Sequence, residues 1–97
     1  MTQTSILAPG VTAGTSTDIV VAAGAAVTVG IYASAADAIL PLVVHFSIWQ
    51  DTPGGDNKLG NAALRQNARQ IVLSGPGTFR VKRPAYSGTA FGVFVET

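Results

Sequence analysis

The chain has 97 residues and no cysteine, and this absence narrows the kinds of protein it can be. A domain of this length buries only about 60–70% of the surface that its unfolded chain exposes, so its core is thin. Small secreted domains usually compensate with disulfides, which this chain cannot form. We therefore expect a protein of the cytosol, or one that gains stability from partners in an assembly.

Charge is also scarce. Charged residues make up 11% of the chain, with only two lysines and one glutamate, whereas about 25% is usual in soluble domains. A free monomer generally needs a charged surface to remain soluble. The composition therefore favours a protein whose surface is covered by copies of itself or by another protein. The alternative is a small Ala- and Gly-rich sheet protein with a neutral surface.

The net charge of +1 makes nucleic acid an unlikely partner, since non-specific binding requires several phosphates to be neutralised at once. No apolar run reaches the roughly 18 residues that indicate a transmembrane helix. The first residues also lack the basic and apolar regions of a signal peptide. We expect neither a membrane nor a nucleic acid as partner.

Residues 1–15 carry no charge, and their apolar residues Ile6, Leu7 and Val11 follow no strand or helix period. Pro9-Gly10 interrupts the segment further. The pattern predicts an extended N-terminal arm that lies on a neighbouring subunit. A frayed terminus is the alternative.

Apolar and polar residues alternate along much of the remaining chain, as in half-buried strands. We predict strands over residues 17–22, 26–33, 42–49, 69–73, 78–83 and 89–96. Residues 42–49 have large side chains on both faces, which predicts a central strand. Residues 58–67 match neither a strand nor a helix pattern clearly. Short strands separated by frequent turns predict an all-β domain over residues 16–97. Its expected fold is a single antiparallel β-sandwich, jelly-roll or Ig-like.

The stretch Ser74–Pro84, SGPGTFRVKRP, places two glycines and a proline before three basic residues. A phosphate-binding loop would open a helix, but here the loop opens a predicted strand. We therefore expect a tight hairpin in which Gly75 and Gly77 supply positive φ angles. On the strand that follows, Arg80 and Lys82 should face solvent.

No residue set indicates catalysis, a cofactor or a metal. His45 has no placed acid beside it, and Ser47 lies about 7 Å away along a strand. The loop Asp51–Asn57 holds Asp51, Asp56 and Asn57, whose default role is to form a turn. A calcium site and a glycosidase carboxylate pair are less favoured alternatives for this loop.

The aromatic residues Trp49, Tyr32 and Tyr86 have three possible roles: packing, a protein interface, or a platform for sugar stacking. The basic residues could form a stripe across adjacent strands. Phe79 is the one aromatic residue interleaved with them, so a nucleic-acid role is not favoured. These basic residues are Arg65, Arg69, Arg80, Lys82 and Arg83. The residues that we predict to contact a partner are Ile6, Leu7, Val11, Trp49 and Tyr86.

The segments VVAAGAAVTVGIY, DTPGGDN and LSGPGTFRVKRP, with GTAFGVFVE near the C-terminus, resemble small virion proteins of tailed bacteriophages. The resemblance covers about Asp18–Glu96, and its most specific part is GPGTFRVKRP with GVFVE. It implies a structural protein that decorates or cements the capsid, located in the virion and made in the host cytoplasm. The implied partners are the major capsid protein or other virion proteins, and copies of the chain itself.

Two other functions remain open at this stage. The first is a receptor- or glycan-binding module of a phage tail or fibre, which would use Trp49, Tyr32 and the loop Asp51–Asn57. The second is a small-molecule enzyme, which no residue pattern supports. The sequence alone does not separate a location on the capsid from one on the tail.

Overall fold

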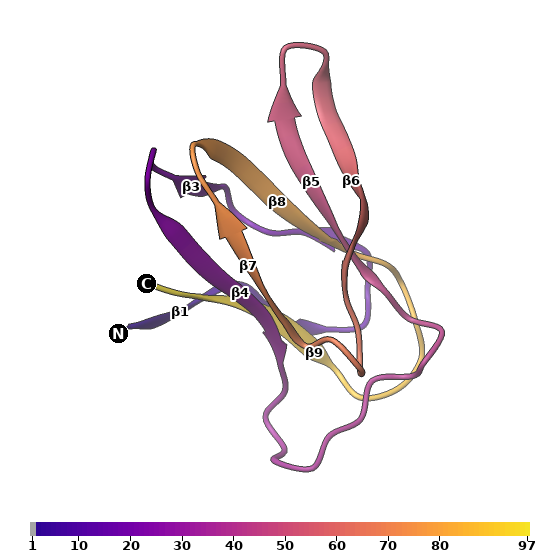
Figure 1. The fold of residues 1–97 in the computed structure, drawn as a ribbon. Coiled ribbons are helices and arrows are strands. Elements are labelled where there is room, and N and C mark those ends of the chain that lie inside the picture. The colour runs from indigo at the N-terminus through magenta and orange to yellow at the C-terminus, as the bar shows by residue number, and fades with distance from the viewer. Residues whose placement is uncertain (1) are drawn as a thin grey trace.

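The computed structural model describes residues 2–97, except for the side chain of Asn61. Over this range the chain forms β-strands and no helix (Figure 1), as the alternating sequence predicts. The strands are β1 (Gln3–Gly10), β2 (Gly14–Thr15), β3 (Ile19–Val21), β4 (Ala26–Tyr32), β5 (Phe46–Thr52), β6 (Gly55–Leu64), β7 (Gln70–Ser74), β8 (Gly77–Arg83) and β9 (Phe91–Glu96).

The strands form two antiparallel sheets that pack as a β-sandwich. The first sheet has the order β1-β9-β4-β7, and the second has the order β2-β8-β5-β6 with β3 also beside β8. Alternating residues of both sheets point inward and form one hydrophobic core. The largest fully buried side chains are Phe46, Phe91, Leu40, Ile48, Leu64, Val21, Val29, Val81 and Val93. The predicted all-β sandwich is confirmed.

Strand β5 lies between β8 and β6, so the expected central strand is present. It begins only at Phe46, however, and residues 42–45 belong to the preceding connection, which turns at Leu42 and Val43. Pro41 lies just before this stretch and has no N–H to donate to a strand partner. β5 continues to Thr52, where a tight turn through Pro53-Gly54 connects it to β6. Most of the predicted loop Asp51–Asn57, and most of the ambiguous segment after it, are therefore strand.

The predicted N-terminal arm is not confirmed. β1 pairs with β9 from Gln3 opposite Glu96 to Gly10 opposite Phe91, and β2 pairs with β8. Residues 3–15 thus add an edge strand to each sheet. The pairing of β1 contains two register shifts, which disrupt the two-residue period that identifies a strand in sequence. Met1 lies outside the described residues.

The predicted hairpin at residues 74–77 is wrong. β7 belongs to the first sheet and β8 to the second, so this connection crosses the sandwich. Positive φ angles occur at Gly24, Gly55 and Gly88, and not at Gly75 or Gly77. Gly75 is needed for close approach instead: a Cβ there would lie 2.7 Å from the carbonyl oxygen of Val21 and closer still to that of Ala22.

Gly75→Ala should therefore destabilise the fold, because the added methyl group meets rigid backbone. We expect a loss of about 1–3 kcal/mol in the free energy of unfolding, the range typical of an overpacked site. Chemical denaturation measures this loss. Gly60→Ala is the matched control, since a Cβ at Gly60 has no atom within 4 Å. Equal stability of the two variants would show that the crossing has room for a side chain.

Candidate functional site

The aromatic residues Trp49, Tyr32 and Tyr86, for which sugar stacking was one of three possible roles, lie apart. Trp49 is in β5 of the second sheet, whereas Tyr32 ends β4 of the first sheet. Tyr86 lies in the connection between β8 and β9, where its hydroxyl donates to the carbonyl oxygen of Thr89 at 2.7 Å and accepts from the amide of Phe91 at 3.0 Å. Tyr86 therefore secures the connection, and the three rings present no common surface.

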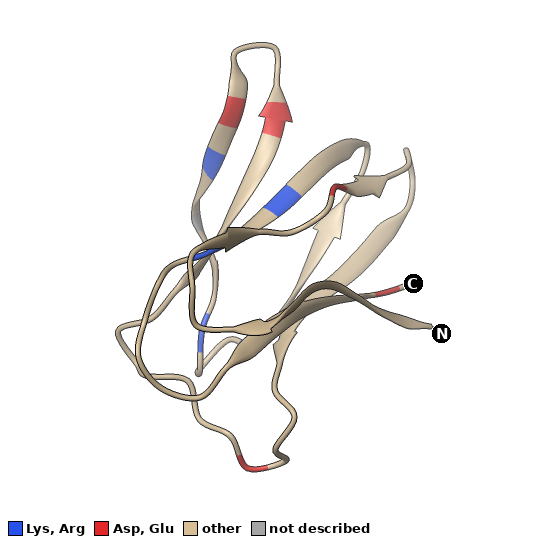
Figure 2. Ribbon diagram, turned by 180° about the vertical axis from the view of Figure 1, so that it is seen from behind, with Lys and Arg blue, Asp and Glu red and all other residues tan. Residues whose placement is uncertain are grey.

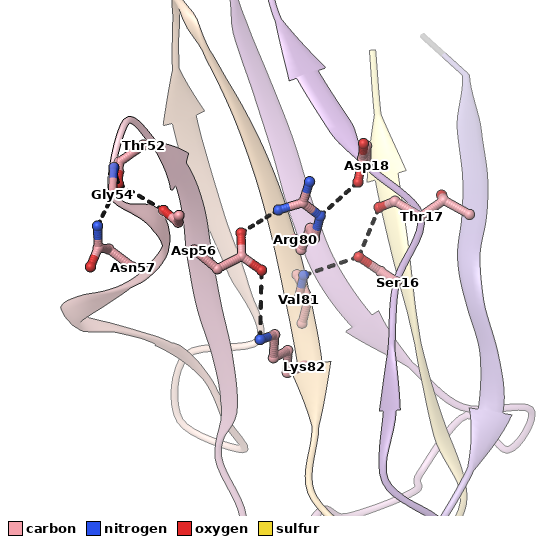
Figure 3. A network of polar contacts seen from close by, with 11 residues as sticks. Ser16, Thr17, Asp18, Thr52, Gly54, Asp56, Asn57, Arg80, Val81 and Lys82 are labelled. Atoms are coloured by element: carbon pink, nitrogen blue, oxygen red, sulfur yellow. Dashed lines mark hydrogen bonds and ion pairs between the residues drawn. The ribbon is translucent and has the colours of Figure 1, made fainter.

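A network of ion pairs occupies the outer face of the second sheet (Figure 3). Arg80 of β8 donates to Asp18 at 2.8 Å and to Asp56 of β6. The Nζ atom of Lys82 lies 3.6 Å from Asp56 Oδ2. The hydrogen bond with Asp18 raises the pKa of Arg80, and desolvation partly opposes this effect. Each cation here has a carboxylate neighbour, so the network adds little net charge to the surface.

The indole of Trp49 is already engaged within this face. Lys82 Nζ lies 3.9 Å from the ring centroid, close enough for a cation–π contact. The indole Nε1 donates to Ser47 Oγ at 2.8 Å. A sugar stacks on a free aromatic face, and Lys82 covers one face of this half-buried ring. That face of Trp49 is therefore not open to a sugar.

The five basic residues that could have formed a stripe do not line up in one (Figure 2). Arg83 is only 7% exposed and points into the protein. The Arg69 guanidinium packs 5.0 Å from the centroid of the Phe91 ring, and Arg65 lies in the turn between β6 and β7. Because Arg80 and Lys82 are paired with carboxylates, no row of free cations crosses the strands.

The acidic residues near the β5–β6 turn do not build a cation site. Asp51 and Asp56 face each other across the two strands, but Asp56 is bound to Arg80 and Lys82. Asn57 lies in β6 and not in the turn, and its side-chain amide donates to the hydroxyl of Thr52. Over the part of the chain that the structure describes, no three His, Cys, Asp or Glu side chains are grouped as metal ligands. His45 is exposed, one residue before β5.

A hollow of about 260 Å³ lies on the outer face of the first sheet and is lined by Gln3, Ser5, Tyr32 and Phe94. Its polar groups already have hydrogen-bond partners: Ser5 Oγ and the Tyr32 hydroxyl are 2.7 Å apart, and Gln3 donates to Glu96, outside the lining, at 2.8 Å. Phe94 packs edge-on against Tyr32. The lining holds neither a nucleophile beside a base nor a free charged group, so it has no evident chemistry.

The residues predicted to contact a partner mostly contact their own chain. Ile6, Leu7 and Tyr86 are half-buried against the core. Val11 is also half-buried, and its carbonyl oxygen accepts from the Tyr86 amide at 2.9 Å. With Trp49 partly covered by Lys82, none of the five forms an open apolar surface.

An apolar surface that the sequence analysis missed lies on the connection from β4 to β5, at the lower end of Figure 1. Ile39, Leu42 and Val43, here called the apolar tip, are 65%, 67% and 88% exposed. Asp37 is the one Asp, Glu, Lys or Arg residue in the connection, residues 33–45, which ends at His45. In the sequence this surface corresponds to the run ILPLVV. The run has too many consecutive apolar residues for all of them to lie on one buried face of a strand.

The apolar tip has a fixed base. Leu40 lies between its residues and is fully buried, and the Leu40 amide donates to Gln66 Oε1 at 2.9 Å. On the other side Val44 is 7% exposed, and its amide donates to the Pro41 carbonyl oxygen at 3.0 Å. Two buried anchors therefore hold three exposed side chains in place.

The contact between Lys82 and Trp49 can be tested by fluorescence, because Trp49 is the only tryptophan. Lys82→Ala should uncover the indole ring and shift its emission to longer wavelength, since water then reaches the ring. Arg65→Ala, which removes an exposed cation elsewhere, should leave the emission unchanged. An unchanged spectrum for Lys82→Ala would contradict the covered position of the ring.

The chain matches no protein-family model, no curated protein and no solved structure closely enough to indicate a relationship. Within residues 2–97 no helix has the length and apolar character needed to cross a bilayer. What the protein does must therefore follow from its own surface. Its most distinctive surface feature is the apolar tip.

Proposed function

We propose that this protein is a non-enzymatic structural component of a virus particle, which decorates or cements a capsid shell through protein–protein contacts. The apolar tip carries this proposal, because Ile39, Leu42 and Val43 gain free energy only when another surface covers them. In this proposal the apolar tip docks on the major capsid protein. The resemblance of residues 18–96 to small phage virion proteins supports the same assignment.

The fixed base of the tip makes it suitable for docking. Leu40 and Val44 are buried, so the exposed side chains are held in position before a partner arrives. Less conformational entropy is then lost on binding than with a free loop. Charge is scarce around the tip, since Asp37 is the one Asp, Glu, Lys or Arg residue of residues 33–45. This scarcity also favours an apolar partner surface over a nucleic acid.

One tip alone would bind weakly. Burying a large aliphatic side chain contributes about 1.5–3 kcal/mol, and association itself costs an estimated 4–15 kcal/mol. Three such side chains contribute about 4.5–9 kcal/mol, which lies within the range of that cost and leaves little surplus. Attachment at many equivalent sites, or by several linked copies, overcomes this limit through effective concentration. A shell with repeated binding positions suits such a weak contact.

The alternative function, a receptor- or glycan-binding module of a tail or fibre, has less support. Its expected residues Trp49 and Tyr32 lie in different sheets, and Lys82 covers a face of Trp49. An enzymatic function also lacks support, since the described residues bring no nucleophile, base and acid together.

Replacing two tip residues should abolish attachment without unfolding the protein. Leu42→Asp with Val43→Asp places two carboxylates where the partner surface must be apolar, while both positions are solvent-exposed in the free chain. We expect the double variant to melt as the native chain does and to be lost from purified particles. Val20→Asp is the matched control, because Val20 is 73% exposed and lies on β3.

The same particles give a second measurement. Quantitative mass spectrometry should find the native chain at a copy number comparable with that of the shell protein. A copy number of only a few per particle would place the protein on the tail or portal instead. Retention of the double Asp variant at the native level would show that the apolar tip does not attach the protein.

A further inference from the structure

Strand β7 has an open edge. In the first sheet it pairs with β4 alone, and among the described residues no other strand lies beside it. Its sequence, QIVLS, contains no charge, no proline and no glycine. Val72 at its centre is 62% exposed. Unpaired strands of this kind are templates for pairing with another chain unless something protects them.

The other edges of the sandwich are protected. β1 contains Pro9 and two register shifts, which bend and interrupt it. β6 contains Gly60 and Lys58, and its pairing with β5 is also shifted. β2 and β3 are only two and three residues long. Irregularity, charge and shortness all prevent edge pairing, so β7 is the exception.

The hydrogen bonds of β7 show which backbone groups are free. The Ile31 amide donates to the Arg69 carbonyl oxygen, and the Gly75 amide donates to that of Ala25, both at 3.0 Å. In an antiparallel ladder every second pair exchanges such bonds. Because the register between β4 and β7 is regular, the backbone N–H and C=O groups of Ile71 and Leu73 bond to β4. The N–H and C=O groups of Gln70, Val72 and Ser74 point away from β4, toward the open edge.

These free groups are arranged symmetrically about Val72. We propose that two copies of the chain pair through antiparallel β7 strands, with Val72 on the two-fold axis. Val72 would then oppose Val72 of the other copy, and Gln70 would oppose Ser74. Each of these pairs uses backbone groups that point to the open edge, so the bonds to β4 remain intact. The result would be one continuous sheet across both copies.

The side chains suit this register. Val72 meets its own copy on the outer face, while Ile71 comes beside Leu73 of the second copy on the inner face. No like charges oppose each other, because residues 70–74 carry none. The contact is isologous, meaning that the same patch serves both partners, and it closes as a dimer rather than growing into a fibre. This inference does not depend on attachment through the apolar tip.

The interface is short, so the dimer should form reversibly, with a dissociation constant in the range of about 1–100 μM. Sedimentation of the native chain over a concentration series should show a mass rising from 9.9 kDa toward twice that value. Val72→Lys places two cations opposite each other on the axis and should weaken association at least about tenfold. Val20→Lys, at a similarly exposed valine on β3, should leave association unchanged.

Amide hydrogen exchange measured by NMR identifies the paired strand directly. The Val72 amide should exchange rapidly in dilute protein and slowly at high concentration, whereas the Ile71 amide is protected throughout by β4. A chain that stays monomeric up to about 1 mM would overturn the proposal. A dimer whose Val72 amide still exchanges rapidly, or one that Val20→Lys disrupts as strongly as Val72→Lys, would overturn it equally.

Discussion

The two sheets and the N-terminal segment are joined by one buried guanidinium. Arg83, the last residue of β8, is 7% exposed, and no salt bridge connects it to a described carboxylate. Its Nε donates to the Thr12 carbonyl oxygen at 2.8 Å, and its Nη1 donates to those of Ala8 and Phe91 at 2.7 and 3.0 Å. A buried charge is costly unless hydrogen bonds compensate it. The fold therefore depends on these carbonyl groups being in place.

The acceptors explain why the N-terminus is part of the sandwich. Ala8 belongs to β1, Thr12 to the link before β2, and Phe91 to β9, so Arg83 of the second sheet connects to the first sheet and to the link between the two. Gly10 stands beside the guanidinium, where a Cβ would lie 2.9 Å from Nη2. A segment held in this way is not available as a free arm for a neighbouring subunit.

This arrangement also determines which surfaces remain open. With β1 paired to β9, the first sheet has its irregular edge at β1 and its regular, uncharged edge at β7. The apolar tip lies on the connection between β4 and β5, at the lower end of the molecule in Figure 1. We infer that β7 joins copies of the chain and the tip joins them to a partner. Two weak contacts of this kind reinforce each other through multivalency.

The sequence predicts the parts of this structure in which side chains alternate regularly. In β8, Phe79 and Val81 point inward, with Arg80 and Lys82 outward, as expected. The same alternation places Arg83 inside, although its charge favours a surface position. The carbonyl groups that accept its hydrogen bonds come from distant segments, so the sequence does not reveal them. The crossing at Gly75 was mistaken for a hairpin because sequence does not reveal that β7 and β8 belong to different sheets. Likewise, the apolar tip resembled the start of a buried strand.

The most direct test of this account is the effect of Arg83→Met on unfolding and on amide exchange. Methionine keeps much of the side-chain volume but leaves the carbonyl oxygens of Ala8, Thr12 and Phe91 without their donor. We expect a loss of about 2–4 kcal/mol in the free energy of unfolding. Amide exchange should accelerate more between β1 and β9 than between β4 and β7, and Arg65→Met should change neither. Native stability together with unchanged protection of β1 would contradict the claim that Arg83 holds the N-terminal segment in the fold.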